Sequence, residues 1–282
     1  EAAAAFAKEV NVGQNIDIAS DGDVYNILLI GSDTRDGWYG NSDSMILASI
    51  NSQTKTIYMT SFMRDLYANI PNVGIRKLNS AYAVGGGPLL VSTIESNYRV
   101  DIDNYASVDF SSMANIIDLV GGVDLEVSTQ EAGYINMYLD EQCRLQGLNA
   151  SDYYVAGGGI THLNGNQAVG FARIRYTSRG NEHSDYGRTS RQREILVQLM
   201  QKARSLDATT LLAVVNNMLP LITHNIDAAT LTTLIANAPS YINYDIQTDR
   251  IPYDGLYSNL GEELVPDFEA TINRLHQTIY GN

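Results

Sequence analysis

The sequence has few of the residues that form disulfides or zinc sites. Cys143 is its only cysteine, which excludes an intrachain disulfide and a cluster of thiolate ligands. The chain also has four histidines, none at the close spacing typical of zinc ligands: His162, His183, His224 and His276. Glycine triplets begin at Gly85 and Gly157, but neither is followed by the Lys-Ser/Thr of a phosphate-binding P-loop. Zinc, disulfide and P-loop chemistry are therefore not expected.

Long hydrophobic runs are also missing. The longest purely apolar stretches are a few residues, such as 27–30, whereas a membrane-spanning helix needs about 20. The chain begins with Glu1 rather than Met, so we expect it to be a piece of a longer protein. We predict a polar leader over residues 1–23 and a single domain over residues 24–282, because no repeat or low-complexity linker marks a further boundary.

Positive charge is scarce. The chain has 18 Lys and Arg against 32 Asp and Glu, a formal net charge of −14, which opposes nucleic-acid binding. Six of these cations are nevertheless arginines between residues 173 and 193. The planar guanidinium matches phosphate oxygens better than an ammonium does, so the cluster favours a polyphosphate partner. Surface ion pairs with Glu182, Asp185 and Glu194 are the alternative.

The remaining pattern alternates between strand-like and helix-like segments, which predicts an α/β protein. Short apolar or alternating runs predict strands at 24–30, 45–50, 56–62, 105–110, 121–127 and 244–251. Helical spacing predicts helices at 89–98, 111–120, 163–172, 188–203, 208–217, 228–238 and 262–280, with another that begins at residue 76 and breaks at the glycines from Gly85. Residues 129–154 are polar and irregular, which predicts a peripheral excursion that carries Cys143.

Charged residues border the first three predicted strands. Asp33 follows the first strand, Asp43 precedes the second, and Arg64 follows the third. Two carboxylates at the ends of adjacent strands suit Mg²⁺, which prefers a few carboxylates together with phosphate oxygens of the substrate. Capping of backbone amides in turns is the alternative for both aspartates.

The arginine cluster coincides with the start of a predicted helix. Arg188, Arg191 and Gln192 are three and four residues apart, so they share one helical face. Free backbone amides and the helix dipole also favour an anion at a helix N-terminus. Arg173 and Arg175 lie on either side of an apolar Ile174, so we expect both to point outward.

Seven motifs follow one another in an order that resembles the LytR-CpsA-Psr family: Gly31-Ser32-Asp33-Thr34-Arg35, Ser42-Asp43-Ser44-Met45, Arg64-Asp65, Lys77-Leu78-Asn79-Ser80-Ala81-Tyr82, Gly121-Gly122-Val123, Ala172-Arg173-Ile174-Arg175, and Asp185-Tyr186-Gly187-Arg188 with Arg191-Gln192. The resemblance runs from about Val24 to the C-terminus. No single motif is specific, but their order is.

The resemblance implies an α/β/α sandwich around a mixed central β-sheet. It places the domain at the extracytoplasmic face of a bacterial membrane, behind an N-terminal transmembrane anchor that is absent from this chain. It also implies a phosphotransferase that uses Mg²⁺, with Mn²⁺ as the alternative. Such an enzyme moves a glycopolymer, for example wall teichoic acid or capsular polysaccharide, from a polyprenyl-pyrophosphate carrier onto peptidoglycan, with pyrophosphatase activity as a side reaction.

By resemblance, the metal ligands are Asp33 and Asp43, and the catalytic residues are Asp33, Arg64, Arg173 and Arg175. The implied pyrophosphate-binding residues are Arg35, Arg64, Lys77, Arg173, Arg175, Asp185, Arg188, Arg191 and Gln192. Asp33 is also the candidate acceptor of the proton from the attacking hydroxyl, and Asp185 is a candidate for orienting an arginine.

The chain departs from the family pattern at two positions. Asn41 stands where the family usually has arginine, and Met63 where it usually has proline before Arg-Asp. Asn41 removes one cationic contact with phosphate. A non-catalytic envelope module that binds polyprenyl phosphate or anionic glycopolymer is therefore an alternative to the enzyme. A transcriptional attenuator that binds nucleic acid is a further alternative, although the net charge opposes it. The sequence predicts no oligomeric state.

Overall fold

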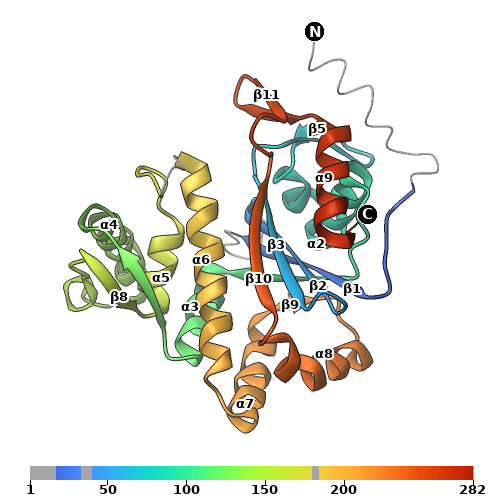
Figure 1. Cartoon of the computed structure of the whole chain (residues 1–282). Coiled ribbons are helices and arrows are strands. Elements are labelled where there is room, and N and C mark those ends of the chain that lie inside the picture. Colours follow the sequence, from blue (N-terminus) through green and yellow to red (C-terminus); the bar gives the residue numbers. More distant parts are fainter. Residues whose placement is uncertain (1–16, 33–39, 180–183, 282) are drawn as a thin grey trace. The chain divides into compact units, whose positions relative to one another are not determined.

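The structure, a computed structural model, describes residues 17–32, 40–179 and 184–281. The described chain divides into two compact units (Figure 1). Unit 1 comprises the described residues up to Ser107, Thr223–Leu231, and those from Tyr244 onward. Unit 2 comprises Val108–Ile222 and Thr232–Asn243. The prediction of a single domain over residues 24–282 stays a prediction.

Unit 1 is built on a mixed six-stranded sheet with the strand order β10-β3-β2-β1-β6-β9. These strands are β1 (Val24–Ser32), β2 (Ser42–Asn51), β3 (Thr56–Phe62), β6 (Asn104–Asp109), β9 (Thr223–His224) and β10 (Asp245–Ile251). β10 runs parallel to β3, whereas β1, β2 and β3 form an antiparallel meander. Buried residues alternate along β1, as an amphipathic strand requires. The mixed sheet, flanked by helices, confirms the predicted α/β fold class.

Helices α2 (Ser80–Tyr98) and α9 (Phe268–Tyr280) pack with this sheet. The rings of Tyr98 and Phe62 lie 4.9 Å apart, centroid to centroid, and those of Tyr98 and Phe268 lie 5.8 Å apart. α2 is interrupted at Gly85 and Gly86, whose backbone angles are not helical, which confirms the predicted break. These aromatic contacts bring α2 and α9 together beside the end of β3.

Two hairpins of unit 1 were not predicted. They are formed by β4 (Tyr67–Ile70) with β5 (Gly74–Lys77), and by β11 (Tyr257–Leu260) with β12 (Glu263–Pro266). The helix that the sequence placed from residue 76 begins instead at Ser80. Lys77 pairs with Tyr67 in the β4–β5 ladder, so residues 76 and 77 belong to a strand. β5 is mostly exposed and lacks the alternation of apolar and polar residues by which a strand is predicted from sequence.

Unit 2 packs helices against a two-stranded hairpin. Its elements are α3 (Phe110–Leu119), β7 (Val123–Val127), α4 (Thr129–Gln146), η1 (Ala150–Tyr153), β8 (Gly159–Leu163), α5 (Gly165–Ala172), α6 (Ser184–Arg204), α7 (Ala208–Met218) and η2 (Leu219–Leu221), while α8 (Ala228–Tyr241) belongs partly to each unit. β7 pairs antiparallel with β8. The predicted helices 111–120, 163–172 and 188–203 correspond to α3, α5 and α6.

The prediction of a peripheral, irregular excursion over residues 129–154 is wrong. Most of it is α4, a helix of 18 residues whose N-terminus is closed by a reciprocal capping box between Ser128 and Glu131. Ala132, Ile135, Leu139 and Cys143 are spaced three and four residues apart and are buried in the core of unit 2. Cys143 is therefore a core residue, and burial raises the pKa of its thiol.

No helix in the described part of the chain is long and apolar enough to cross a membrane. This agrees with the short apolar runs of the sequence.

Candidate functional site

The predicted site residues fall into two groups, one in each unit. The group in unit 1 lies where β2 begins and where β3 and β5 end. Arg64 contacts two carboxylates, with its Nη1 3.5 Å from Asp43 Oδ1 and its Nε 3.4 Å from Asp65 Oδ2. Lys77 Nζ lies 2.9 Å from Asp65 Oδ1. Asp65 thus links the predicted residues Arg64 and Lys77, and Arg64 in turn contacts Asp43.

The strand register explains why this group forms. Ser32, the last described residue of β1, pairs with Ser42, which immediately precedes Asp43. The Ser42 hydroxyl donates to the backbone carbonyl of Asn79, at 3.5 Å. The backbone N–H of Asn79 donates in turn to the Arg64 carbonyl, at 3.2 Å. The segments that carry Asp43, Arg64 and Lys77 are therefore tied through hydrogen bonds to the backbone of Asn79 near the end of β1.

Lys77 illustrates the electrostatics of this group. Its hydrogen bond to Asp65 raises the pKa of the ammonium, with a smaller contribution from Glu262, while burial acts in the opposite direction. Lys77 therefore stays a cation, as phosphate binding requires. Two further predicted residues, Asp33 and Arg35, lie outside the described residues.

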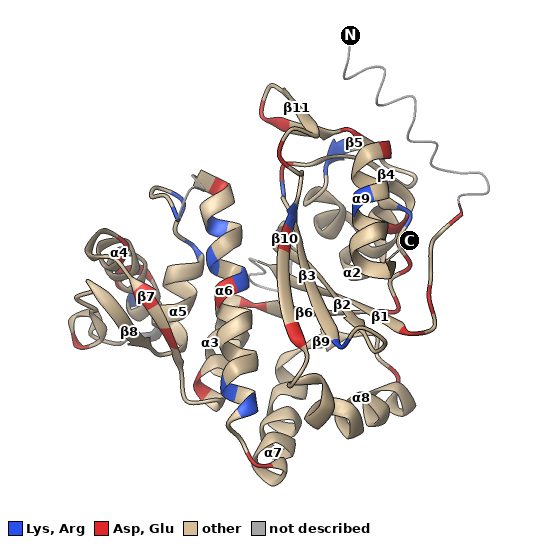
Figure 2. Ribbon diagram, in the orientation of Figure 1, with Lys and Arg blue, Asp and Glu red and all other residues tan. Residues whose placement is uncertain are grey.

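The group in unit 2 lies between the end of α5 and the first turns of α6, where Figure 2 shows basic segments in blue. Arg175 Nε lies 3.7 Å from Asp185 Oδ1, and Arg188 Nε lies 3.5 Å from the same oxygen. Arg188 is almost fully buried, with 2% of its side chain exposed, whereas 36% of the Arg175 side chain is exposed. Asp185 thus contacts two guanidiniums, and its orienting role stays a prediction.

Arg173 is held by aromatic rings. It is the C-cap residue of α5, and its guanidinium carbon lies 4.6 Å from the centroid of the Tyr138 ring and 5.2 Å from that of Phe110. Its Nη2 donates to Glu141 Oε2 at 3.3 Å. The Tyr138 hydroxyl donates to the Arg173 backbone carbonyl at 3.1 Å. Cation–π contacts with two rings, together with the ion pair to Glu141, hold this guanidinium in place.

The arginines also bear on the electrostatics of Tyr138. Burial raises the pKa of its phenol, and Arg173, Arg175 and Arg188 all act in the opposite direction. Three positive charges, from the end of α5, the loop after it and α6, thus act on one side chain. Such a concentration of guanidiniums suits an anion with several oxygens, such as a diphosphate. Ile174 between Arg173 and Arg175 is fully buried, as predicted.

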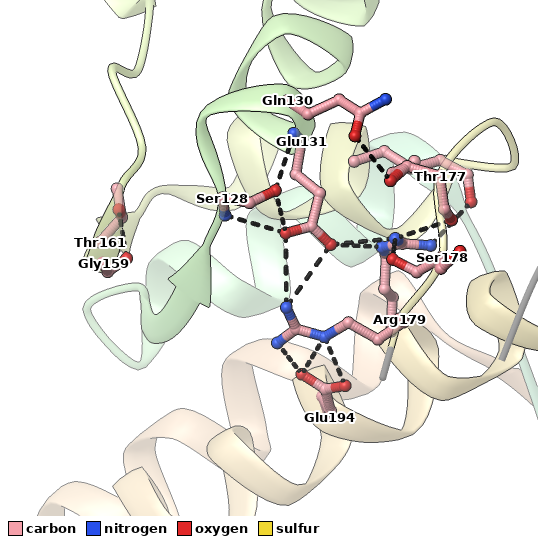
Figure 3. A network of polar contacts seen from close by, with 11 residues as sticks. Ser128, Gln130, Glu131, Gly159, Thr161, Thr177, Ser178, Arg179 and Glu194 are labelled. Atoms are coloured by element: carbon pink, nitrogen blue, oxygen red, sulfur yellow. Dashed lines mark hydrogen bonds and ion pairs between the residues drawn. The ribbon is translucent and has the colours of Figure 1, made fainter. Parts of the chain in front are cut away.

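Arg191 has a different environment from the other predicted arginines. No part of its side chain is exposed. Its Nε donates to Glu131 Oε1 at 2.9 Å, and its other donors reach the backbone carbonyls of Ile174, Thr177 and Ser178. Figure 3 shows the surrounding network, in which Arg179 lies between Glu131 and Glu194. Gln192, the next residue of α6, is partly buried.

The sequence reasoning missed Glu131, Tyr138 and Glu141, which all belong to α4. A signal was present: Ser128 precedes Glu131 by three residues, the spacing of a capping box, and an apolar stripe follows it. The contacts of these residues with the arginines come from tertiary packing, which that signal does not encode.

Among the described residues, no three His, Cys, Asp or Glu side chains gather in a group that could hold a metal ion. Asp43 offers a partly exposed hard oxygen donor, with 21% of its side chain accessible. A single carboxylate of this kind fits Mg²⁺, which takes few protein ligands and completes its shell with phosphate oxygens and water.

The chain is similar to known proteins in both sequence and structure. A sequence profile of the LytR_cpsA_psr family matches residues 1–274. The polyisoprenyl-teichoic acid–peptidoglycan teichoic acid transferase TagU of Oceanobacillus iheyensis is 35% identical over 272 residues, which cover 92% of this chain and 76% of the relative. Among solved structures, protein gbs0355 from Streptococcus agalactiae has a TM-score of 0.73 at 25% identity, covering 91% of this chain and 88% of that one. TagT bound to LIIa-WTA has a TM-score of 0.70 at 21% identity, covering 93% and 92% respectively.

Proposed function

The chain belongs to the LytR-CpsA-Psr family, and on this basis we propose that it transfers a glycopolymer from a polyprenyl-pyrophosphate carrier onto peptidoglycan. The observation that carries the proposal is the convergence of Arg175 and Arg188 on Asp185, with Arg173 beside them at Tyr138. Support for the substrate comes from the TagU relative, whose name states a transfer of teichoic acid to peptidoglycan.

The reaction is a displacement at phosphorus. A hydroxyl of the peptidoglycan acceptor attacks the phosphorus that bears the glycan and forms a new P–O bond, while the P–O bond to the bridging oxygen breaks. Polyprenyl monophosphate leaves with the bridging oxygen, and the hydroxyl proton passes to a base. Negative charge shifts onto the bridging oxygen as that bond breaks, so fixed guanidiniums lower the barrier by electrostatic stabilisation.

The residues of each group take distinct parts in this proposal. Arg173, Arg175 and Arg188 bind phosphate oxygens, and Asp185 orients Arg175 and Arg188. In the other group, Arg64 and Lys77 supply positive charge, and Asp43 is a metal carboxylate. Mg²⁺, when bound, neutralises phosphate charge and acts as a Lewis acid. Asp33 stays the predicted second metal carboxylate and proton acceptor, and Arg35 and Gln192 stay predicted pyrophosphate contacts.

The test is a transfer assay with a polyprenyl-pyrophosphate-linked glycan, a peptidoglycan oligomer and Mg²⁺. We expect Arg175→Ala to lower transfer by about 100-fold or more, the usual effect of removing one group that stabilises developing charge. Arg144→Ala is the matched control, because Arg144 is an exposed arginine of the same unit. Wild-type turnover in Arg175→Ala would refute the assignment.

The same assay separates the alternatives. Tight binding of the carrier without product, with Mg²⁺ present, would indicate a non-catalytic envelope module. Release of polyprenyl monophosphate without an acceptor, and no transfer product when the acceptor is present, would show a pyrophosphatase rather than a transferase. Removal of the metal with a chelator is expected to abolish transfer, and restoration by Mg²⁺ or Mn²⁺ would identify the ion that the protein uses.

A further inference from the structure

Glu131 is a buried carboxylate at the first turn of α4, and its side chain is 3% exposed. It accepts hydrogen bonds from the backbone N–H and the hydroxyl of Ser128, each at 2.9 Å. It also lies 2.9 Å from Arg191 Nη2 and 3.4 Å from Arg179 Nη1 (Figure 3). One carboxylate therefore serves as a helix cap and as the partner of two arginines.

Arg191 extends this contact to the backbone of the preceding loop. Its Nη1 donates to the carbonyl of Ile174 at 3.3 Å, and its Nη2 donates to the carbonyls of Thr177 and Ser178, both at 3.1 Å. The fixed fork of a guanidinium can bind three carbonyls and a carboxylate together, which a lysine cannot do. The neighbouring Gln130 accepts a hydrogen bond from the Thr177 hydroxyl at 3.2 Å.

The loop held in this way contains Arg175. The backbone of residues 174–178 is fixed at Ile174 on one side of Arg175 and at Thr177 and Ser178 on the other. Arg179, just beyond, is tied to Glu131 and Glu194. Two guanidiniums and two carboxylates balance in charge, which a buried cluster requires if it is to be stable.

We propose that Glu131 is a positioning residue for Arg175: it fixes the Arg191 guanidinium, and that guanidinium fixes the backbone of residues 174–178. Arg191 is accordingly a positioning residue and not a pyrophosphate ligand. The inference deepens the proposed function and rests on it only for the identity of the ligand. The geometry of the loop can be tested without any ligand.

The first experiment measures hydrogen exchange of backbone amides by mass spectrometry in the Glu131→Gln variant. Glutamine has the same shape but no charge, so its contact with Arg191 is weakened. We expect peptides that cover residues 173–179 to lose protection by about tenfold, while peptides of the distal part of α6 do not change. Ile135→Val is the matched control, because it removes one methyl group from the buried face of α4 and leaves the network intact. Unchanged protection of the loop would overturn the proposal.

The second experiment is a double-mutant cycle on binding of geranylgeranyl pyrophosphate, followed by calorimetry. We expect Glu131→Gln and Arg175→Ala each to lower affinity by about tenfold, and the double variant to lower it no further than Arg175→Ala alone. Effects that add, or full affinity in Glu131→Gln, would show that Glu131 does not act through Arg175. A wild-type protein that fails to bind the probe would count against the proposed function, and the exchange result would still decide the inference.

Arg191→Lys repeats both measurements if Glu131→Gln does not fold. It keeps a positive charge beside Glu131 but removes the fork that binds the three carbonyls. The same loss of protection and the same absence of additivity with Arg175→Ala are expected. Arg191→Lys with wild-type protection in residues 173–179 would overturn the proposal.

Discussion

At the scale of single residues, Glu95 provides a test of pH-dependent stability. Burial raises the pKa of its carboxyl above the ordinary 4.5, and Asp101 and Asp103 add to the effect. The folded state therefore favours the protonated form, so this contribution to stability is complete below about pH 4.5 and is lost as the pH rises through the folded-state pKa. Above that pKa, the charged carboxylate costs stability.

We therefore expect Glu95→Gln to raise the melting temperature at pH 7 by a few degrees and to change it little near pH 4. The glutamine oxygen can still accept the Ile102 N–H, which now donates to Glu95 at 3.2 Å. Scanning calorimetry at the two pH values measures the difference, with the exposed Glu126→Gln as control. A larger gain at pH 4 than at pH 7 would contradict the sign of the pKa shift.

Residue types were easier to predict than residue partners. The sequence predicted an anion-binding arginine cluster, and the structure brings Arg175 and Arg188 to Asp185. Helical spacing also placed Arg188 and Arg191 on one face, yet Arg191 contacts Glu131, a residue 60 positions earlier in the chain. Such a partner depends on how α4 packs against α6, and spacing along one helix contains no information about it.

At the scale of elements, two glycines of unit 2 predict opposite effects of adding a methyl group. Gly133 lies inside α4 with no atom within 4 Å of the position that a Cβ would occupy. At Gly165 a Cβ would lie 2.0 Å from the Ala114 carbonyl oxygen, because α5 begins directly against α3. Glycine in a helix costs about 1 kcal/mol of stability relative to alanine. The space around the added methyl group therefore decides whether each substitution stabilises or destabilises the protein.

We expect Gly133→Ala to increase the free energy of unfolding by about 0.5–1 kcal/mol. Gly165→Ala is expected to decrease it by about 3 kcal/mol, because backbone must move to admit the methyl group. Urea titration followed by circular dichroism measures both. A neutral Gly165→Ala would mean that α3 and α5 do not approach as closely as the structure shows.

Helices and strands with a clear hydrophobic pattern in the sequence were predicted well. Those in which polar and apolar residues are mixed were not. The apolar runs of β1, β2 and β3 are short and bordered by turn residues, and all three strands were found. In α4 the buried apolar residues alternate with many polar ones, such as Gln130, Asn136 and Asp140, so its buried stripe was overlooked. The β4–β5 hairpin was missed because β5 is largely exposed and has no alternating pattern.

At the scale of the whole molecule, the net charge of −14 predicts weak interaction with nucleic acid. Phosphate contacts with DNA require basic surface, and Arg191 of the arginine cluster is fully buried. We expect no retention on immobilised duplex DNA at about 0.15 M salt, where unspecific contacts are already screened. Retention that falls steeply with added salt would instead support the attenuator alternative.

The parallel pairing of β10 with β3 has a consequence for the order in which the protein folds during synthesis. β10 begins at Asp245, so the sheet that starts with β1 lacks this edge strand until residues 245–251 have left the ribosome. At about 5–20 residues per second, that delay after β3 is on the order of 10 seconds. Unit 2 consists mainly of the continuous stretch Val108–Ile222 and can fold in this interval.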